Sequence, residues 1–104
     1  MIAYNASSPT LAQALPANDT YQDAVQIIGT GASVRATPGS GGAVTVQYTY
    51  SSLASIQAGT ATWYTAPAFA GVSVVAEDTL RYRVTAIRAK QTGGSAPGLM
   101  EVCQ

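Results

Sequence analysis

This 104-residue chain contains five carboxylates and no histidine, so any acid–base catalysis would depend on the carboxylates. A catalytic carboxylate pair needs two groups that face each other across a cleft, about 5 to 10 Å apart. Glu77 and Asp78 are adjacent, and we interpret them as a solvated turn from which the side chains diverge. Without histidine, a Ser-His-Asp triad is impossible and zinc lacks its usual ligands. The sequence therefore predicts no enzyme, no catalytic residue, no metal ligand and no cofactor site; its carboxylates are Asp19, Asp23, Glu77, Asp78 and Glu101.

Three other features that resemble chemical sites have simpler explanations. Asp19 and Asp23 could offer oxygen ligands to calcium, but the spacing of an EF-hand is absent. Cys103 is the only cysteine, so it cannot form an internal disulfide, and we interpret it as a small hydrophobic residue. The glycines at 29 and 31 match the start of a dinucleotide-binding fingerprint, but the third glycine is missing, and the pattern favours a hairpin turn.

The aromatic residues offer contact surface rather than catalysis. Trp63 is the only tryptophan, and we favour a core position for it, with tyrosines at the sheet edges. Tyr50 and Tyr64 then become candidates for an interface, where tyrosine is enriched. The other interpretation is a sugar-stacking platform, formed by Trp63 with Tyr48, Tyr50, Tyr64 and Tyr82.

Arg81 and Arg83, with Arg88 as a further candidate, form the second candidate contact surface. In TLRYRVTAIRAK, residues 79–90, Arg81 and Arg83 alternate with apolar residues, so a single strand would place both on one outward face, near Glu77 and Asp78. A solvated, partly ion-paired face is one interpretation. Docking on an acidic partner surface is the other.

The elements that must position these residues are predicted to be short strands. Val44, Val46, Tyr48 and Tyr50 alternate with polar residues, which is the period of a half-buried strand. Similar stretches lie at 61–66, 72–76, 79–90 and 99–102, separated by turn signals such as the glycines at 39–42. No helical period competes. The pattern predicts an all-β fold, a single small antiparallel β-sandwich or barrel of about seven short strands.

We expect the chain to consist of an extended N-terminal arm, residues 1–20, and a β-sandwich domain, residues 21–104. Pro9 and Pro16 bracket TLAQAL too closely for a stable helix. Tyr4 and Leu11 are among the apolar anchors of this arm. It would lie on its own domain or on a neighbouring one.

Charge and hydropathy disfavour several classes of partner. Five basic and five acidic residues cancel, and no basic stripe suggests nucleic acid. No apolar run approaches the ~18 residues of a membrane span, and the N-terminus lacks the pattern of a signal peptide. A net charge of zero protects a protein poorly from self-association. Such a surface suits a protein that is docked in an assembly.

The runs VQYTYS, AGTATW, VTAIR and LMEV occur in this order within residues 43–102. Through these runs, residues 43–102 resemble small virion-associated structural proteins of tailed bacteriophages. The resemblance implies a capsid decoration or head-stabilising protein, assembled into the virion in the host cytoplasm, with the major capsid protein or another virion protein as partner. The arm and exposed strand edges would suit a homo-oligomer, such as a trimer. The residues expected at these interfaces are Tyr4, Leu11, Tyr50, Tyr64, Arg81 and Arg83.

A carbohydrate- or receptor-binding β-sandwich module of a phage fibre or surface protein is the alternative function. This alternative predicts that Trp63 is exposed, whereas a scaffold predicts that it is buried.

Overall fold

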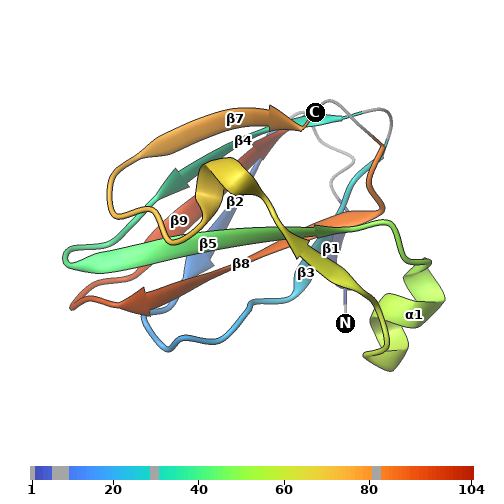
Figure 1. Cartoon of the computed structure of the whole chain (residues 1–104), viewed down its shortest axis with the longest axis horizontal. Helices are drawn as coiled ribbons and strands as arrows, with labels where there is room; N and C mark the ends of the chain where they lie inside the picture. The colour runs from blue at the N-terminus through green and yellow to red at the C-terminus, as the bar shows by residue number, and fades with distance from the viewer. Residues whose placement is uncertain (1, 6–9, 29–30, 81–82) are drawn as a thin grey trace.

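Two β-sheets face each other in the computed structural model, which describes residues 2–5, 10–28, 31–80 and 83–104 (Figure 1). One sheet has the strand order β1-β3-β8-β5-β6 and the other β2-β9-β4-β7. Neighbouring strands are antiparallel, except that β1 and β3 are parallel. The predicted all-β sandwich is confirmed, with nine strands rather than seven in the part of the chain that is described. The elements are β1 (Ile2–Asn5), β2 (Thr10–Leu15), β3 (Ala24–Gln26), β4 (Ala32–Thr37), β5 (Gly42–Thr49), α1 (Leu53–Ala58), β6 (Trp63–Thr65), the 3₁₀ turn η1 (Pro67–Phe69), β7 (Ala76–Leu80), β8 (Ala86–Gly93) and β9 (Gly98–Cys103).

The segment predicted as an N-terminal arm contributes two of these strands. β2 pairs with β9 along six residues, and Leu15 at its end is fully buried. Leu11 packs against the main core, so of the two alternatives for the arm this part lies on its own domain. Tyr4 lies in β1, opposite Val25 of β3.

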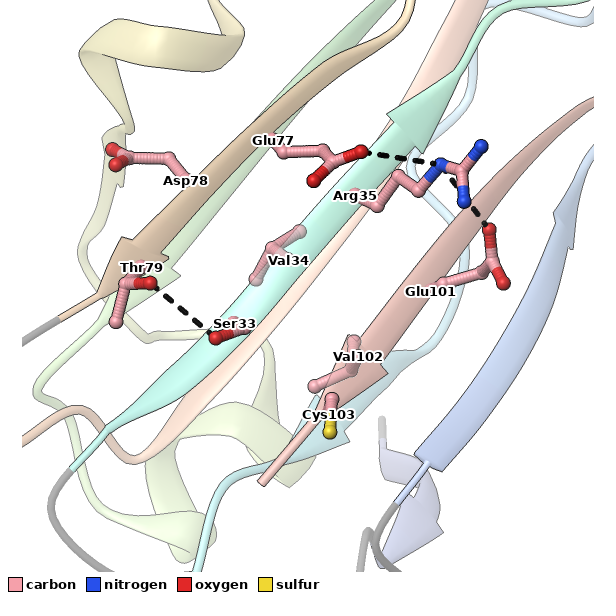
Figure 2. Close-up of a pocket in the computed structure, with 9 residues that line it drawn as sticks. All are labelled: Ser33, Val34, Arg35, Glu77, Asp78, Thr79, Glu101, Val102 and Cys103. Atoms are coloured by element: carbon pink, nitrogen blue, oxygen red, sulfur yellow. Dashed lines mark hydrogen bonds and ion pairs between the residues drawn. The ribbon is translucent and has the colours of Figure 1, made fainter.

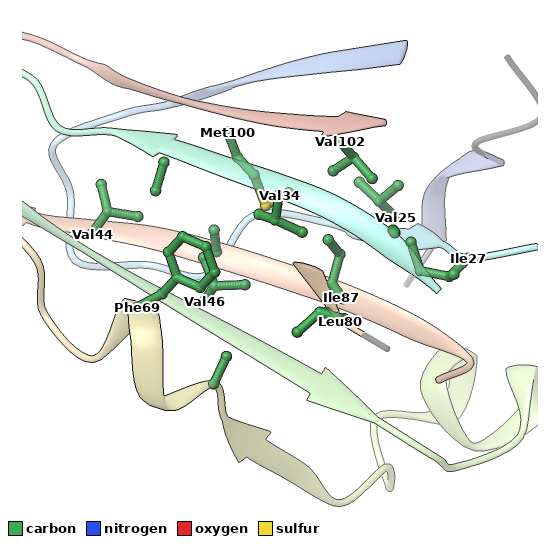
Figure 3. Close-up of a cluster of buried hydrophobic side chains, with 14 of the residues drawn as sticks. Val25, Ile27, Val34, Val44, Val46, Phe69, Leu80, Ile87, Met100 and Val102 are labelled. Atoms are coloured by element: carbon green, nitrogen blue, oxygen red, sulfur yellow. The ribbon is translucent and has the colours of Figure 1, made fainter. Parts of the chain in front are cut away.

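Side chains from both sheets fill one main core between the layers (Figure 3). The alternation predicted for β5 is confirmed at Val44 and Val46, which are both fully buried, because every second residue of β5 faces the other sheet. Phe69, the only phenylalanine, enters this core from η1 at the side of the sandwich. The buried members contributed by the four-stranded sheet are Leu15, Ala32, Val34, Ala36, Leu80, Met100 and Val102.

One interrupted segment covers the edge of β5. β6 pairs with β5, and the Ala66 N–H then donates to the Val46 carbonyl at 2.9 Å. Farther along, Val72 and Val44 exchange two backbone hydrogen bonds of 2.9 Å. Between these contacts the chain leaves the edge as η1 and buries Phe69. The aromatic stretch is therefore a three-residue edge strand followed by a core-filling turn.

The continuous strand predicted over residues 79–90 is wrong, as is the acidic turn at Glu77 and Asp78. Both acidic residues lie inside β7, which ends at Leu80 in the four-stranded sheet, whereas β8 begins at Ala86 in the other sheet. The chain crosses between the layers here. Leu80 and Val84 are both buried, so the apolar alternation continues across a connection that is not one strand.

A short helix, α1, forms where no helix was predicted. The Ser52 hydroxyl accepts a hydrogen bond from the Ser55 N–H at 3.2 Å, which caps the N-terminus. Gly59 ends the helix in the left-handed conformation, with φ at 76°. Ile56 is the buried residue of this helix, and it packs with Ala24 and Ala86 in a second, smaller cluster.

A buried amide closes one end of the sandwich. Gln91 is fully buried, and its Oε1 accepts from the Gly39 N–H at 2.8 Å. Its Nε2 donates to the carbonyl oxygens of Ala96 at 2.7 Å and Gly93 at 3.1 Å. A Cβ on Gly98 would overlap Oε1 of Gln91, so this strand start needs glycine. One side chain thus holds two turns together.

Replacing Gln91 with alanine should lower the free energy of unfolding by about 3 kcal/mol, because a buried polar group without a partner costs about 1–3 kcal/mol and the Gly39 and Ala96 groups both lose theirs. Urea denaturation followed by circular dichroism measures this. Gln57→Ala, at an exposed position of α1, is the matched control and should change stability by less than about 0.5 kcal/mol. Equal small losses in the two variants would contradict the assigned role of Gln91.

Candidate functional site

The described polar and aromatic side chains gather in three places on the surface. We call them the tyrosine cluster (Tyr48, Tyr50 and Tyr64), the Arg35 face and the Arg88 pocket. Across residues 2–5, 10–28, 31–80 and 83–104, no group of three histidine, cysteine, aspartate or glutamate side chains is arranged to hold a metal ion.

The tyrosine cluster lies where β5 ends beside β6. Tyr48 is opposite Tyr64 in the register, and their rings stack with centroids 5.7 Å apart. Tyr50 follows β5 and meets Tyr48 edge-on at 5.6 Å. The exposed fractions of Tyr50 and Tyr64 are 56% and 48%, and partial desolvation, followed by the neighbouring tyrosines, raises the pKa of Tyr50. Both residues predicted as interface tyrosines thus belong to one exposed aromatic patch.

Trp63 does not join this patch. It precedes Tyr64 in β6, so the two side chains point to opposite faces of the sheet. Trp63 is half-buried against the small cluster of Ala24, Ile56 and Ala86, outside the main core. Trp63 therefore does not form the predicted platform with Tyr48, Tyr50 and Tyr64, and Tyr82, its fourth predicted partner, lies outside the described residues. The core position favoured for Trp63 is found only in part, because Trp63 packs partly buried against the smaller cluster and not in the main core.

The arginine face predicted around Arg81 and Arg83 rested on the strand over 79–90. Arg83 is exposed, but it lies in the connection between β7 and β8. Arg81 and Tyr82 lie outside the described residues. The strand alternation that joined the two arginines on one face therefore does not hold.

The Arg35 face is the outer surface of the four-stranded sheet (Figure 2). Arg35 of β4 reaches from its Nε to Oε1 of Glu77 in β7 at 3.7 Å and to Oε1 of Glu101 in β9 at 3.8 Å. Asp78 points away from them (Figure 2). These residues line an open groove of about 470 Å³, together with Ser33, Val34, Thr79, Val102 and Cys103.

Water surrounds most of the charges in the Arg35 face. Arg35 and Glu77 are exposed and Glu101 is half-buried, and ion pairs in such positions contribute about 0–1 kcal/mol. The Cys103 thiol at the end of β9 is exposed, rather than packed as a small hydrophobic residue. The contacts on this face are solvated and run across neighbouring strands. The Arg35 guanidinium is shared by the carboxylates of Glu77 and Glu101.

The Arg88 pocket lies on the outer face of the five-stranded sheet. The guanidinium carbon of Arg88 is 4.2 Å from the ring centroid of Tyr21 and 4.2 Å from that of Trp63. Its Nε and Nη2 donate to Oε1 of Gln47 at 3.0 and 2.8 Å. Partial burial lowers the pKa of Arg88 from its ordinary value. The pocket, of about 330 Å³, is lined by Tyr21, Gln22, Asp23, Ala24, Ile56, Gly59, Ala61, Trp63 and Arg88.

The segment before β3 holds Tyr21 in place. The Asp19 N–H donates to the Gln91 carbonyl, and the Gln22 N–H donates to the Ala89 carbonyl, both at 3.0 Å. The Asp19 carboxylate accepts from Thr92 Oγ1 at 2.8 Å and pairs with Lys90 Nζ at 3.0 Å. These contacts bind the segment to β8. The sequence suggested Arg88 only as a further member of the cluster of Arg81 and Arg83, and it did not indicate its partners, which come from 25 to 67 positions away.

No known protein family, curated protein or solved structure matches this chain significantly. Within the described residues, no helix is long and apolar enough to cross a membrane.

Replacing Arg35 with glutamine should lower the free energy of unfolding by less than about 1 kcal/mol, because its ion pairs are solvated. The difference should vanish at about 1 M salt, where the Debye length is only about 3 Å. Urea denaturation at low and high salt checks both points. A loss that is larger and independent of salt would contradict the description of this face.

Hydrogen bonds from Thr92 and Lys90, followed by the charge of Lys90, lower the pKa of Asp19. A carboxylate with a lowered pKa in the folded state stabilises the protein above its unfolded pKa, and this contribution disappears as the pH falls through the folded value. The wild type should therefore exceed Asp19→Asn in melting temperature above about pH 4, and the gap should narrow at lower pH. Thermal melts across this range measure the gap. A difference that stays constant with pH would refute the role of the Asp19 charge.

Proposed function

We propose that this chain is a non-enzymatic structural component of a bacteriophage virion, a decoration or stabilising protein that binds the head shell through the tyrosine cluster. The observation that carries the proposal is the patch formed by Tyr48, Tyr50 and Tyr64, in which two rings are about half exposed and each ring contacts the other two. Tyrosines are rigid, combine apolar area with a polar tip, and are enriched in protein interfaces. The resemblance of residues 43–102 to virion proteins supplies the identity of the partner.

The low charge of the chain supports a docked state. Only 10% of the residues are charged and the net charge is zero, so long-range repulsion opposes neither a shell nor further copies of the chain. Neighbours in a lattice stabilise a folded subunit by mass action. A symmetric homo-oligomer, such as a trimer, is part of the proposal, with the major capsid protein or another virion protein as partner.

Mass spectrometry of purified particles from a phage that encodes this chain tests its location. A copy number close to that of the major capsid protein supports head decoration. A few copies per particle would indicate a location in the neck or tail and would contradict binding to the head shell. Particles that lack the chain would end the proposal.

The double substitution Tyr50→Ala and Tyr64→Ala should weaken binding to undecorated shells at least tenfold, which corresponds to about 1.4 kcal/mol. Val74→Ser is the matched control, because Val74 is 72% exposed and lies outside the cluster. Co-sedimentation with shells measures both variants, and circular dichroism confirms that both are folded. Unchanged binding of the double variant would exclude the tyrosine cluster as the docking surface.

A further inference from the structure

The guanidinium of Arg88 is held in one orientation before any ligand arrives. Tyr21 comes from the β3 side of β8 and Trp63 from the β6 side, and each ring lies 4.2 Å from the guanidinium carbon. Gln47 fixes the Nε and Nη2 edge with two hydrogen bonds to one oxygen. A preorganised side chain loses little conformational freedom on binding, so more of its hydrogen-bond energy contributes to affinity.

The other donor edge of Arg88 remains available. Arginine carries five N–H donors, and the two bonds to Gln47 use two of them. Within the described residues, the Arg88 guanidinium forms no ion pair and no hydrogen bond besides the two to Gln47. This edge is the planar fork that matches a carboxylate with two parallel hydrogen bonds.

An opposite charge lines the same pocket without pairing with Arg88. Asp23 is exposed at the pocket, and its carboxylate forms no ion pair or side-chain hydrogen bond within the described part of the chain. Its backbone is fixed, because the Asp23 carbonyl accepts from Gln13 Nε2 at 3.0 Å. Arg88 and Asp23 line the same pocket of about 330 Å³ and form no ion pair with each other, so each charge is available to a ligand in that pocket. That ligand must present a carboxylate to one side and a donor cation to the other.

We propose that the Arg88 pocket binds a small zwitterion of the α-amino acid class, with the ligand carboxylate on the Nη1 and Nη2 fork of Arg88 and the ligand ammonium on Asp23. The exposed lining of the pocket is mostly polar, and Ile56, Ala61 and Trp63 supply its smaller apolar part, against which the aliphatic side chain of the ligand packs. The volume is at the small end of ligand sites, as a single amino acid requires. This site goes beyond the shell-docking role and does not depend on it, because the tyrosine cluster lies on the other face of the sheet.

Trp63 is a built-in reporter for this site, because it is the only tryptophan and it lines the pocket. Titration of the full chain with L-leucine should change the Trp63 emission in a saturable way, and calorimetry should give the same dissociation constant. 4-Methylpentanoate lacks the ammonium and 3-methylbutylamine lacks the carboxylate. Each should bind at least tenfold more weakly than leucine.

Two substitutions assign the two charges. Asp23→Asn lies at an exposed position, so it should leave the fold intact and weaken leucine binding at least tenfold, while the binding of 4-methylpentanoate weakens less. Arg88→Lys keeps the charge but removes the fork, and should also weaken leucine binding at least tenfold. Arg35→Gln, on the opposite sheet, is the matched control and should bind leucine like the wild type.

Three results would overturn the proposal. The first is the absence of any leucine-dependent signal in both emission and calorimetry. The second is equal affinity for leucine and 4-methylpentanoate, which would indicate a site for carboxylates alone. The third is unchanged leucine binding in Asp23→Asn. Because none of these measurements involves virus particles, failure here is distinct from failure of the proposed virion role.

Discussion

The amide of Gln91 imposes a geometric constraint on the whole end of the sandwich. An amide buried between two sheets must have partners for both its donor and its acceptor, because an unpaired polar group there is costly. Gln91 finds them in the backbone of Gly39, Gly93 and Ala96. The two turns must therefore approach one side chain closely, which explains glycine at positions where a Cβ would collide with it, Gly42 and Gly98. Gln91 thereby ties the turn at Gly39 to the turn at Gly93 and Ala96 at this end of the apolar core.

The five-stranded sheet performs different tasks with its two faces. Its inner face supplies Val44, Val46 and Ile87 to the main core. Its outer face carries the stacked Arg88, the small cluster around Ile56 and the segment held by Asp19. Successive side chains of a strand point to opposite faces of the sheet. The close packing of the inner face therefore also fixes where the side chains of the outer face lie.

The sequence predicted this structure well where one strand had one buried face. In β5 the alternation placed Val44 and Val46 correctly, and LMEV gave the closing strand β9. It was wrong between Leu80 and Ala86, because apolar alternation continued through a crossover that carries no glycine or proline. The helix α1 was missed although Ser52 and Gly59 are typical cap residues, since its six residues are too few to show a helical period. The Arg88 pocket could not be predicted, because Tyr21, Trp63 and Arg88 meet only through the strand order β3-β8-β5-β6.

The edges of the sheets restrict how this domain can dock. β6 has three residues and is followed by Pro67, so it offers little backbone for an added strand. β7 carries Glu77, Asp78 and Thr79 in succession, all exposed, and Asp78 is opposite the inward-facing Val34 in the register. Exposed charged residues along an edge strand disfavour edge-to-edge pairing. A partner at this side of the molecule must therefore contact side chains rather than extend a sheet, and the largest exposed apolar side chains beside β6 are Tyr50 and Tyr64. The short strand β6 thus both limits the free backbone at this edge and places Tyr64 beside Tyr50.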